Sequence, residues 1–123
     1  MKIAIPTLGE KGLDEIVSQH FGRCETYTIL DEKGLLIKII ENISSHNGGQ
    51  GLPPELLQKN GINVLLCKGI GPMAIDLCKE LNITVYVNSG KTVKEIFENW
   101  KRDSPLPASV DDSCEEHRSW ELL

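Results

Sequence analysis

The segment Ser18–Cys24 gathers a hydroxyl, an imidazole, a guanidinium and a thiol within seven residues. This stretch, the His20 segment, lies between two strand-like runs, so we predict a loop or a short helical turn. Loops held by a rigid scaffold often carry binding residues. His20 is the side chain best suited to bind a metal, because its imidazole has a nitrogen lone pair and titrates near neutral pH. A loop histidine bonded only to the backbone is the alternative.

The neighbours of His20 favour the metal-binding interpretation. Gly22 would allow a ligand to approach closely, and Arg23 would add positive charge for an anionic ligand. Cys24 would add a soft sulfur donor. We therefore expect an inorganic or otherwise anionic ligand at this segment.

Two further stretches could take part in such a site. His46 lies in a glycine-rich loop, where it is either a second ligand or a solvated histidine. Gly69-Ile70-Gly71-Pro72 precedes a predicted helix, and backbone N–H groups at a helix N-terminus attract anions. This stretch lacks the Walker lysine and the full dinucleotide fingerprint, and a tight turn alone would also explain its glycines.

The remaining cysteines divide into different settings. Cys67 ends a predicted strand and could line a crevice, whereas Cys78 lies on an apolar helix face and is expected in the core. Cys114 and His117 form a C-x-x-H pair that could ligate a metal if the tail folds back, or stay in a solvated acidic tail. No C-x-x-C pair is present, so a zinc ribbon or a thioredoxin-type site is not supported.

The composition is that of an ordinary globular domain. The chain has 123 residues, 40% of them hydrophobic, and a net charge of −5. No Lys/Arg cluster stands out, so we predict no nucleic-acid partner. The first apolar run is too short for a signal peptide or a membrane span, so we expect a cytoplasmic protein with reduced cysteines and no membrane association.

The hydrophobic pattern predicts strands and helices in the order β-β-β-α-β-α-β-α. We expect strands at residues 2–6, 26–30, 35–40, 62–66 and 83–87, and helices beginning near Pro53, Pro72 and Thr92. Thr92 begins a capping-box pattern and is the predicted N-cap of the third helix. We predict one α/β domain over residues 1–102 and a flexible acidic tail over residues 103–123.

This order places the candidate residues at one edge of a mixed sheet. Right-handed crossovers would make the first, third, fourth and fifth strands parallel. The loops that follow them, carrying His20, His46, Gly69–Gly71 and Ser89-Gly90, would then emerge together. Ligands in open α/β sheets favour the crevice where the strand order reverses.

The ordered set of motifs resembles the dinitrogenase iron-molybdenum cofactor biosynthesis family, which includes NifX-like carriers and NifB carboxy-terminal-like domains. The matching stretches are Met1–Pro6, Ser18-x-His20-Phe21-Gly22-Arg23, the His46 glycine loop, and Gly69–Pro72 followed by Ala74. The resemblance implies a ribonuclease H-like motif with a five-stranded mixed sheet flanked by three helices. It also implies binding of an iron–sulfur or molybdenum-containing cluster without a catalysed reaction.

The family's site residues carry over to His20, Gly22, Gly69 and Gly71, whereas Cys24 departs from the family pattern. We predict a non-catalytic carrier that works with cofactor-assembly proteins or a partner ATPase. The predicted cofactor-binding residues are Ser18, Gly22, Arg23, Gly69 and Gly71, and the predicted metal ligands are His20, Cys24, His46, Cys114 and His117. The alternatives are a metal-free interaction module for an assembly ATPase or oxidoreductase, and a hydrolase or nuclease, which the first strand disfavours because it has no carboxylate.

Overall fold

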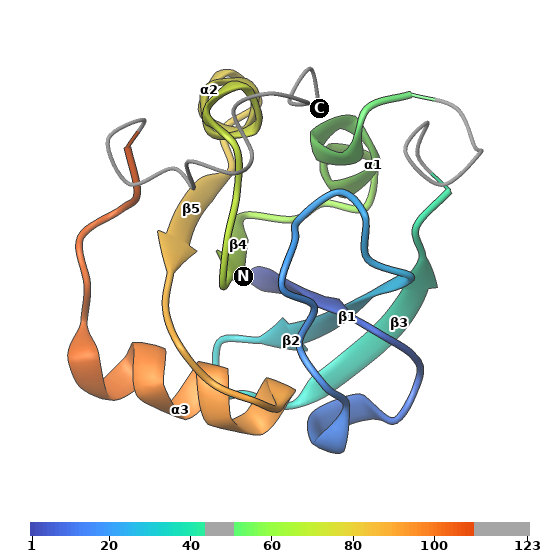
Figure 1. The fold of residues 1–123 in the computed structure, drawn as a ribbon, viewed down its shortest axis with the longest axis vertical. Coiled ribbons are helices and arrows are strands. Elements are labelled where there is room, and N and C mark those ends of the chain that lie inside the picture. Colours follow the sequence, from blue (N-terminus) through green and yellow to red (C-terminus); the bar gives the residue numbers. More distant parts are fainter. Residues whose placement is uncertain (44–50, 110–123) are drawn as a thin grey trace.

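The computed structural model describes residues 1–43 and 51–109. The strands are β1 (Lys2–Thr7), β2 (Thr26–Asp31), β3 (Leu36–Glu41), β4 (Val64–Cys67) and β5 (Thr84–Val87). A short 3-10 helix, η1 (Gly12–Asp14), and the α-helices α1 (Pro53–Lys59), α2 (Pro72–Glu80) and α3 (Val93–Asp103) complete the fold (Figure 1). The five predicted strands and three predicted helices are all present.

The strands form one mixed sheet in the order β3-β2-β1-β4-β5. β1 pairs in parallel with β4, which pairs in parallel with β5, whereas β2 runs antiparallel to both β1 and β3. β1, β3, β4 and β5 therefore point the same way, and the loops after them leave at one edge, here named the carboxyl edge. This confirms the predicted mixed sheet and its common edge of loops; the ribonuclease H-like motif stays a prediction.

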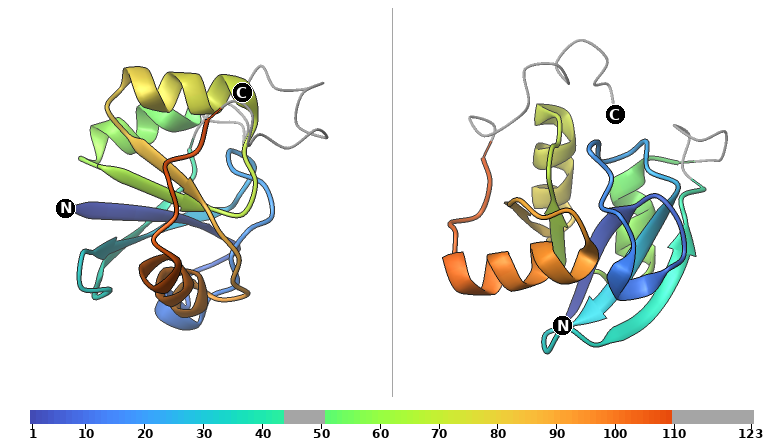
Figure 2. Two further views of the ribbon diagram at one scale, coloured as in Figure 1. Left: turned by 90° about the vertical axis from the view of Figure 1, so that its left-hand side faces the viewer. Right: turned by 60° about the horizontal axis from the view of Figure 1, so that its bottom comes forward.

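Helices cover both faces of the sheet, with α1 and α2 on one side and α3 and η1 on the other (Figures 1 and 2). Side chains of a strand alternate between its faces. Ala4 therefore joins the cluster beneath α1 and α2, while Ile3 and Ile5 join the cluster beneath α3. Burial on both faces explains why β1 is an almost continuous apolar run.

The start of α3 is fixed by the predicted cap. The Thr92 hydroxyl accepts a hydrogen bond of 3.3 Å from the Glu95 N–H, which confirms Thr92 as the N-cap. Backbone hydrogen bonds of 2.9 and 3.0 Å join residues 91–93 to residues 15–17. The cap of α3 thus helps to hold the chain just before the His20 segment.

Two apolar regions are more exposed than their sequence suggests. Leu35, Leu36 and Ile37 have exposed fractions of 60%, 46% and 43%, because β3 is an edge strand and its pairing with β2 is irregular there. Met73, an apolar residue in the first turn of α2, is 46% exposed. The buried face of that helix is made by Ala74, Ile75 and Cys78 instead.

The chain continues along the sheet after α3. Ser104 ends the helix in a left-handed conformation with φ 43°, and the Ala108 N–H donates a 2.7 Å hydrogen bond to the Val85 carbonyl. Residues 104–109 thereby reach the outer edge of β5. Residues 110–123, most of the predicted tail, lie outside the described residues. Of the helices in residues 1–43 and 51–109, none has the length and apolarity needed to cross a membrane.

We expect Thr92→Ala to lower the free energy of unfolding by about 1 kcal/mol, because it leaves an N–H of the first turn of α3 without its acceptor. Thr92→Ser keeps the hydroxyl and serves as the matched control, with a loss below about 0.5 kcal/mol. Urea unfolding followed by circular dichroism measures both. Equal losses for the two variants would contradict the capping role.

Candidate functional site

The first residue of the His20 segment, Ser18, lies beside the carboxyl end of β1. Val17 bridges back to Thr7, and the Ser18 N–H donates a 2.8 Å hydrogen bond to the Pro6 carbonyl. The Ser18 hydroxyl donates to the His20 carbonyl at 3.2 Å and accepts from the His20 N–H at 3.3 Å. Ser18 is buried, so its observed role is to shape the backbone around the partly exposed His20.

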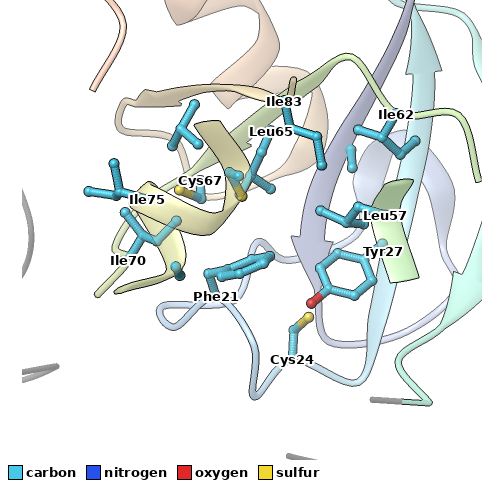
Figure 3. Packing of buried hydrophobic residues seen from close by; sticks show 14 of the residues in the cluster. Phe21, Cys24, Tyr27, Leu57, Ile62, Leu65, Cys67, Ile70, Ile75 and Ile83 are labelled. Carbon is cyan, nitrogen blue, oxygen red and sulfur yellow. The ribbon is translucent and has the colours of Figure 1, made fainter. Parts of the chain in front are cut away.

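Phe21 joins this segment to the turn after β4. Its N–H donates a 3.1 Å hydrogen bond to the Gly69 carbonyl. Its ring points into the core beneath α1 and α2 and lies 5.9 Å from the ring of Tyr27 (Figure 3). Burying a side chain of this size contributes roughly 1.5–3 kcal/mol. The structure therefore brings the His20 segment and the Gly69–Gly71 turn together, as the sequence predicted.

The Gly69–Gly71 turn leads directly into α2. Gly71 is the N-cap of the helix and Pro72 is its first residue. A proline at this position loses no needed N–H group. The positive end of the α2 dipole consequently lies at the carboxyl edge, next to the turn that bonds Phe21.

Arg23 is exposed at a shallow polar groove of about 600 Å³. The groove is lined by Gly9, Glu10, Arg23, Glu25, Thr26, Glu41 and Asn42. Its charged groups are thus three carboxylates and one guanidinium. The charge of Arg23 is offset locally, which weakens the predicted attraction of this residue for an anion.

Cys24 points inward. Its exposed fraction is 1%, and its thiol faces the buried Tyr27 hydroxyl (Figure 3). Burial raises the pKa of the Cys24 thiol from 9.0 to about 11. The thiol is therefore protonated at neutral pH, whereas the thiolate is the form that binds metal. This geometry counts against Cys24 as a ligand while the segment keeps its described conformation.

The Tyr27 hydroxyl is a second buried polar group at this place. It makes no hydrogen bond of good geometry within the described residues. Burial raises the pKa of Tyr27 well above its usual value, and the adjacent Cys24 adds to the effect. Both groups are consequently held in their neutral forms beneath the His20 segment.

The other described cysteines belong to the core. Cys67, which we expected could line the crevice, is fully buried, and its thiol lies 3.9 Å from the Tyr86 carbonyl. Cys67 points into the core because successive residues of a strand alternate between its two faces and both faces of this sheet are covered. Cys78 is a core residue as predicted, and burial raises its pKa to about 12.

Sequence reasoning missed Asn42. This buried residue follows β3 directly, and its side-chain amide donates hydrogen bonds to the carbonyls of Gly22 and Cys24. The only signal was its position as a polar residue close after an apolar strand, where a side chain can bond a neighbouring loop. Asn42 also shows that the loop carrying His46 begins beside the His20 segment.

Three predicted ligands, His46, Cys114 and His117, lie outside the described residues. The predicted meeting of two imidazoles on one rim therefore stays a prediction. Within residues 1–43 and 51–109, no three His, Cys, Asp or Glu side chains are arranged to hold a metal ion. What those residues offer a ligand is one partly exposed imidazole, backbone turns and a helix N-terminus.

The sequence of this chain is similar to a known protein family and to a protein of an archaeon. Residues 1–103 match the family model described as dinitrogenase iron-molybdenum cofactor. The chain is 35% identical over 101 residues to the uncharacterized protein MJ0580 of Methanocaldococcus jannaschii, covering 77% of this chain and 80% of that protein.

Two solved structures share the fold. The apo form of the orange protein from Desulfovibrio gigas is 26% identical, with a TM-score of 0.74 and coverage of 87% of this chain and 92% of that one. The NMR structure of TM1290, a NifB-like protein of Thermotoga, is 27% identical, with a TM-score of 0.68 and coverage of 93% and 97%.

We expect the Cys24 thiol to resist alkylation by iodoacetamide in the native protein at pH 8, because it is buried and protonated. Modification should become rapid in urea, with peptide mass spectrometry identifying the site. The folded state favours the neutral thiol, so this contribution to stability is complete below about pH 9 and is lost as the pH rises toward about 11. Rapid labelling of Cys24 in native protein would contradict the described burial.

Proposed function

Because the chain belongs to the dinitrogenase iron-molybdenum cofactor family, as its sequence motifs predicted, we propose that it binds a metal–sulfur cluster reversibly in cofactor assembly. The cargo is an iron–sulfur or molybdenum-containing cluster, and the protein carries it without catalysing a reaction. The observation that supports this most is the placement of His20. Its backbone is held by Ser18, and the adjacent Phe21 is bonded to the Gly69 turn where the strand order reverses.

The chemistry of the carboxyl edge suits such a cargo. Metal–sulfur clusters are commonly anionic, and turn N–H groups and helix N-termini stabilise anions. The Gly69–Gly71 turn and the first turn of α2 would supply these groups beside His20. The imidazole would bind the metal through its lone pair.

The small number of ligands favours a carrier over a protein with a permanent centre. A resident metal site needs several fixed ligands in good geometry. We propose that His46 shares the cargo with His20, and that Cys114 and His117 add ligands from the tail. Cys24 would join only after the His20 segment opens. A partly open set of ligands lets a cofactor-assembly protein or a partner ATPase deliver or remove the cluster.

A metal-free interaction module is the second candidate. Leu35, just before the edge strand β3, and Leu36 and Ile37 at its start favour it, since exposed apolar side chains beside an open strand edge suit a partner surface. Capture of one stoichiometric partner by protein stripped of metal would support this function. If the same partner were captured equally well after Leu36→Lys, this patch would not be the surface involved.

The test is anaerobic titration with ferrous iron and sulfide, and separately with tetrathiomolybdate, followed by absorption spectroscopy. We expect wild-type protein to bind, and His20→Ala to weaken binding about tenfold or more, which corresponds to about 1.4 kcal/mol. Gln19→Ala is the matched control, because Gln19 is the exposed neighbour of His20 in the same segment. Equal affinity of His20→Ala and wild type would remove His20 as the ligand.

A further inference from the structure

We propose that Asn42 is the positioning residue that fixes the shape of the His20 segment, an inference that rests on the cluster-binding function above. Asn42 lies one residue after β3, and 5% of its surface is exposed. Its side chain contacts the backbone of the segment. Its effect on binding would therefore pass through the backbone that carries His20.

Asn42 bonds the end of the segment and the residue that follows it through both its side chain and its backbone. Its side-chain Nδ2 donates to the Gly22 carbonyl at 2.8 Å and to the Cys24 carbonyl at 2.9 Å. Its backbone N–H donates to the Glu25 carbonyl at 3.0 Å. An amide nitrogen has two hydrogens, so both are used and both acceptors are main-chain groups of one turn.

This turn needs an internal donor. Gly22 has a φ of 95°, which is the left-handed region that a residue with a side chain seldom adopts. The Gly22 and Cys24 carbonyls both accept from the side-chain nitrogen of Asn42. Both hydrogen bonds are buried, as are the side chains of Asn42 and Cys24. Without a donor, these carbonyls would be buried and unsatisfied, which costs about 1–3 kcal/mol for each group. The turn would otherwise have to change its conformation so that these carbonyls reach water or another donor.

The segment is therefore held at two points on either side of Gly22. On one side, the Phe21 N–H is bonded to Gly69 and the Phe21 ring is buried in the core. On the other side, Asn42 bonds Gly22, Cys24 and Glu25. His20 directly precedes the first of these points. Losing the second would let the backbone after His20 move while the core stays packed.

Asn42 also connects the two loops with predicted ligands. It stands four residues before His46 in the sequence, at the start of the loop that follows β3. The side chain of the residue that begins this loop is thus bonded to the backbone of the His20 segment.

The test compares Asn42→Ala with Asn60→Ala in the full chain. Asn60 is a matched control because its Nδ2 also donates to a main-chain carbonyl, that of Leu56 at 2.9 Å, at the end of α1 away from the site. Amide hydrogen exchange in the cargo-free protein reports on the segment, and tetrathiomolybdate titration reports on binding. Asn42→Ser keeps one short O–H donor in place of the amide, so it replaces Asn42→Ala if that variant does not fold.

We expect Asn42→Ala to speed exchange at residues 21–25 and to weaken tetrathiomolybdate binding, each by about tenfold. Asn60→Ala should change neither, even where it lowers global stability by a similar amount. Unchanged exchange and affinity in Asn42→Ala would overturn the inference alone. Wild-type protein that binds no probe would overturn the proposed function and the inference together, which separates the two failures.

Discussion

The pairing of β1 with β2 on one side and with β4 on the other determines where the site can form. β1 ends at Thr7 and β4 ends at Cys67, side by side and in the same direction. The chain leaves β1 toward β2 and leaves β4 toward β5, so the strand order reverses between them. A ligand crevice is expected at such a reversal. The hydrogen bond between Phe21 and Gly69 spans this place.

Much of this arrangement was predictable because its signals are local. The apolar run of β1, the prolines that open α1 and α2, and the cap at Thr92 each fix an element within a few residues. The shared direction of β1, β3, β4 and β5 then follows from the handedness of the crossovers. The position of His20 at the carboxyl edge needed no information beyond these rules.

The orientation of individual side chains was harder to predict. Cys24 has the chemistry of a ligand, but its thiol points into the core, because the turn at Gly22 directs it beneath the segment. Arg23 has the charge to attract an anion, yet it shares its groove with three glutamates that come from separate parts of the chain. Such contacts depend on tertiary packing, which the spacing of residues does not reveal. Asn42 was missed for the same reason, since its partners are 20 and 18 residues away.

In the part of the chain that the structure describes, the outer edges of the two edge strands, β3 and β5, differ. Ala108 donates a main-chain hydrogen bond to Val85 on β5, whereas β3 is the opposite outer strand and presents exposed aliphatic side chains. If the segment at Ala108 keeps other strands from β5, the sheet can join only one further copy, because pairing β3 with β3 uses the open side of both molecules. Strand addition would therefore stop at a closed two-fold pair and would not propagate into a fibre.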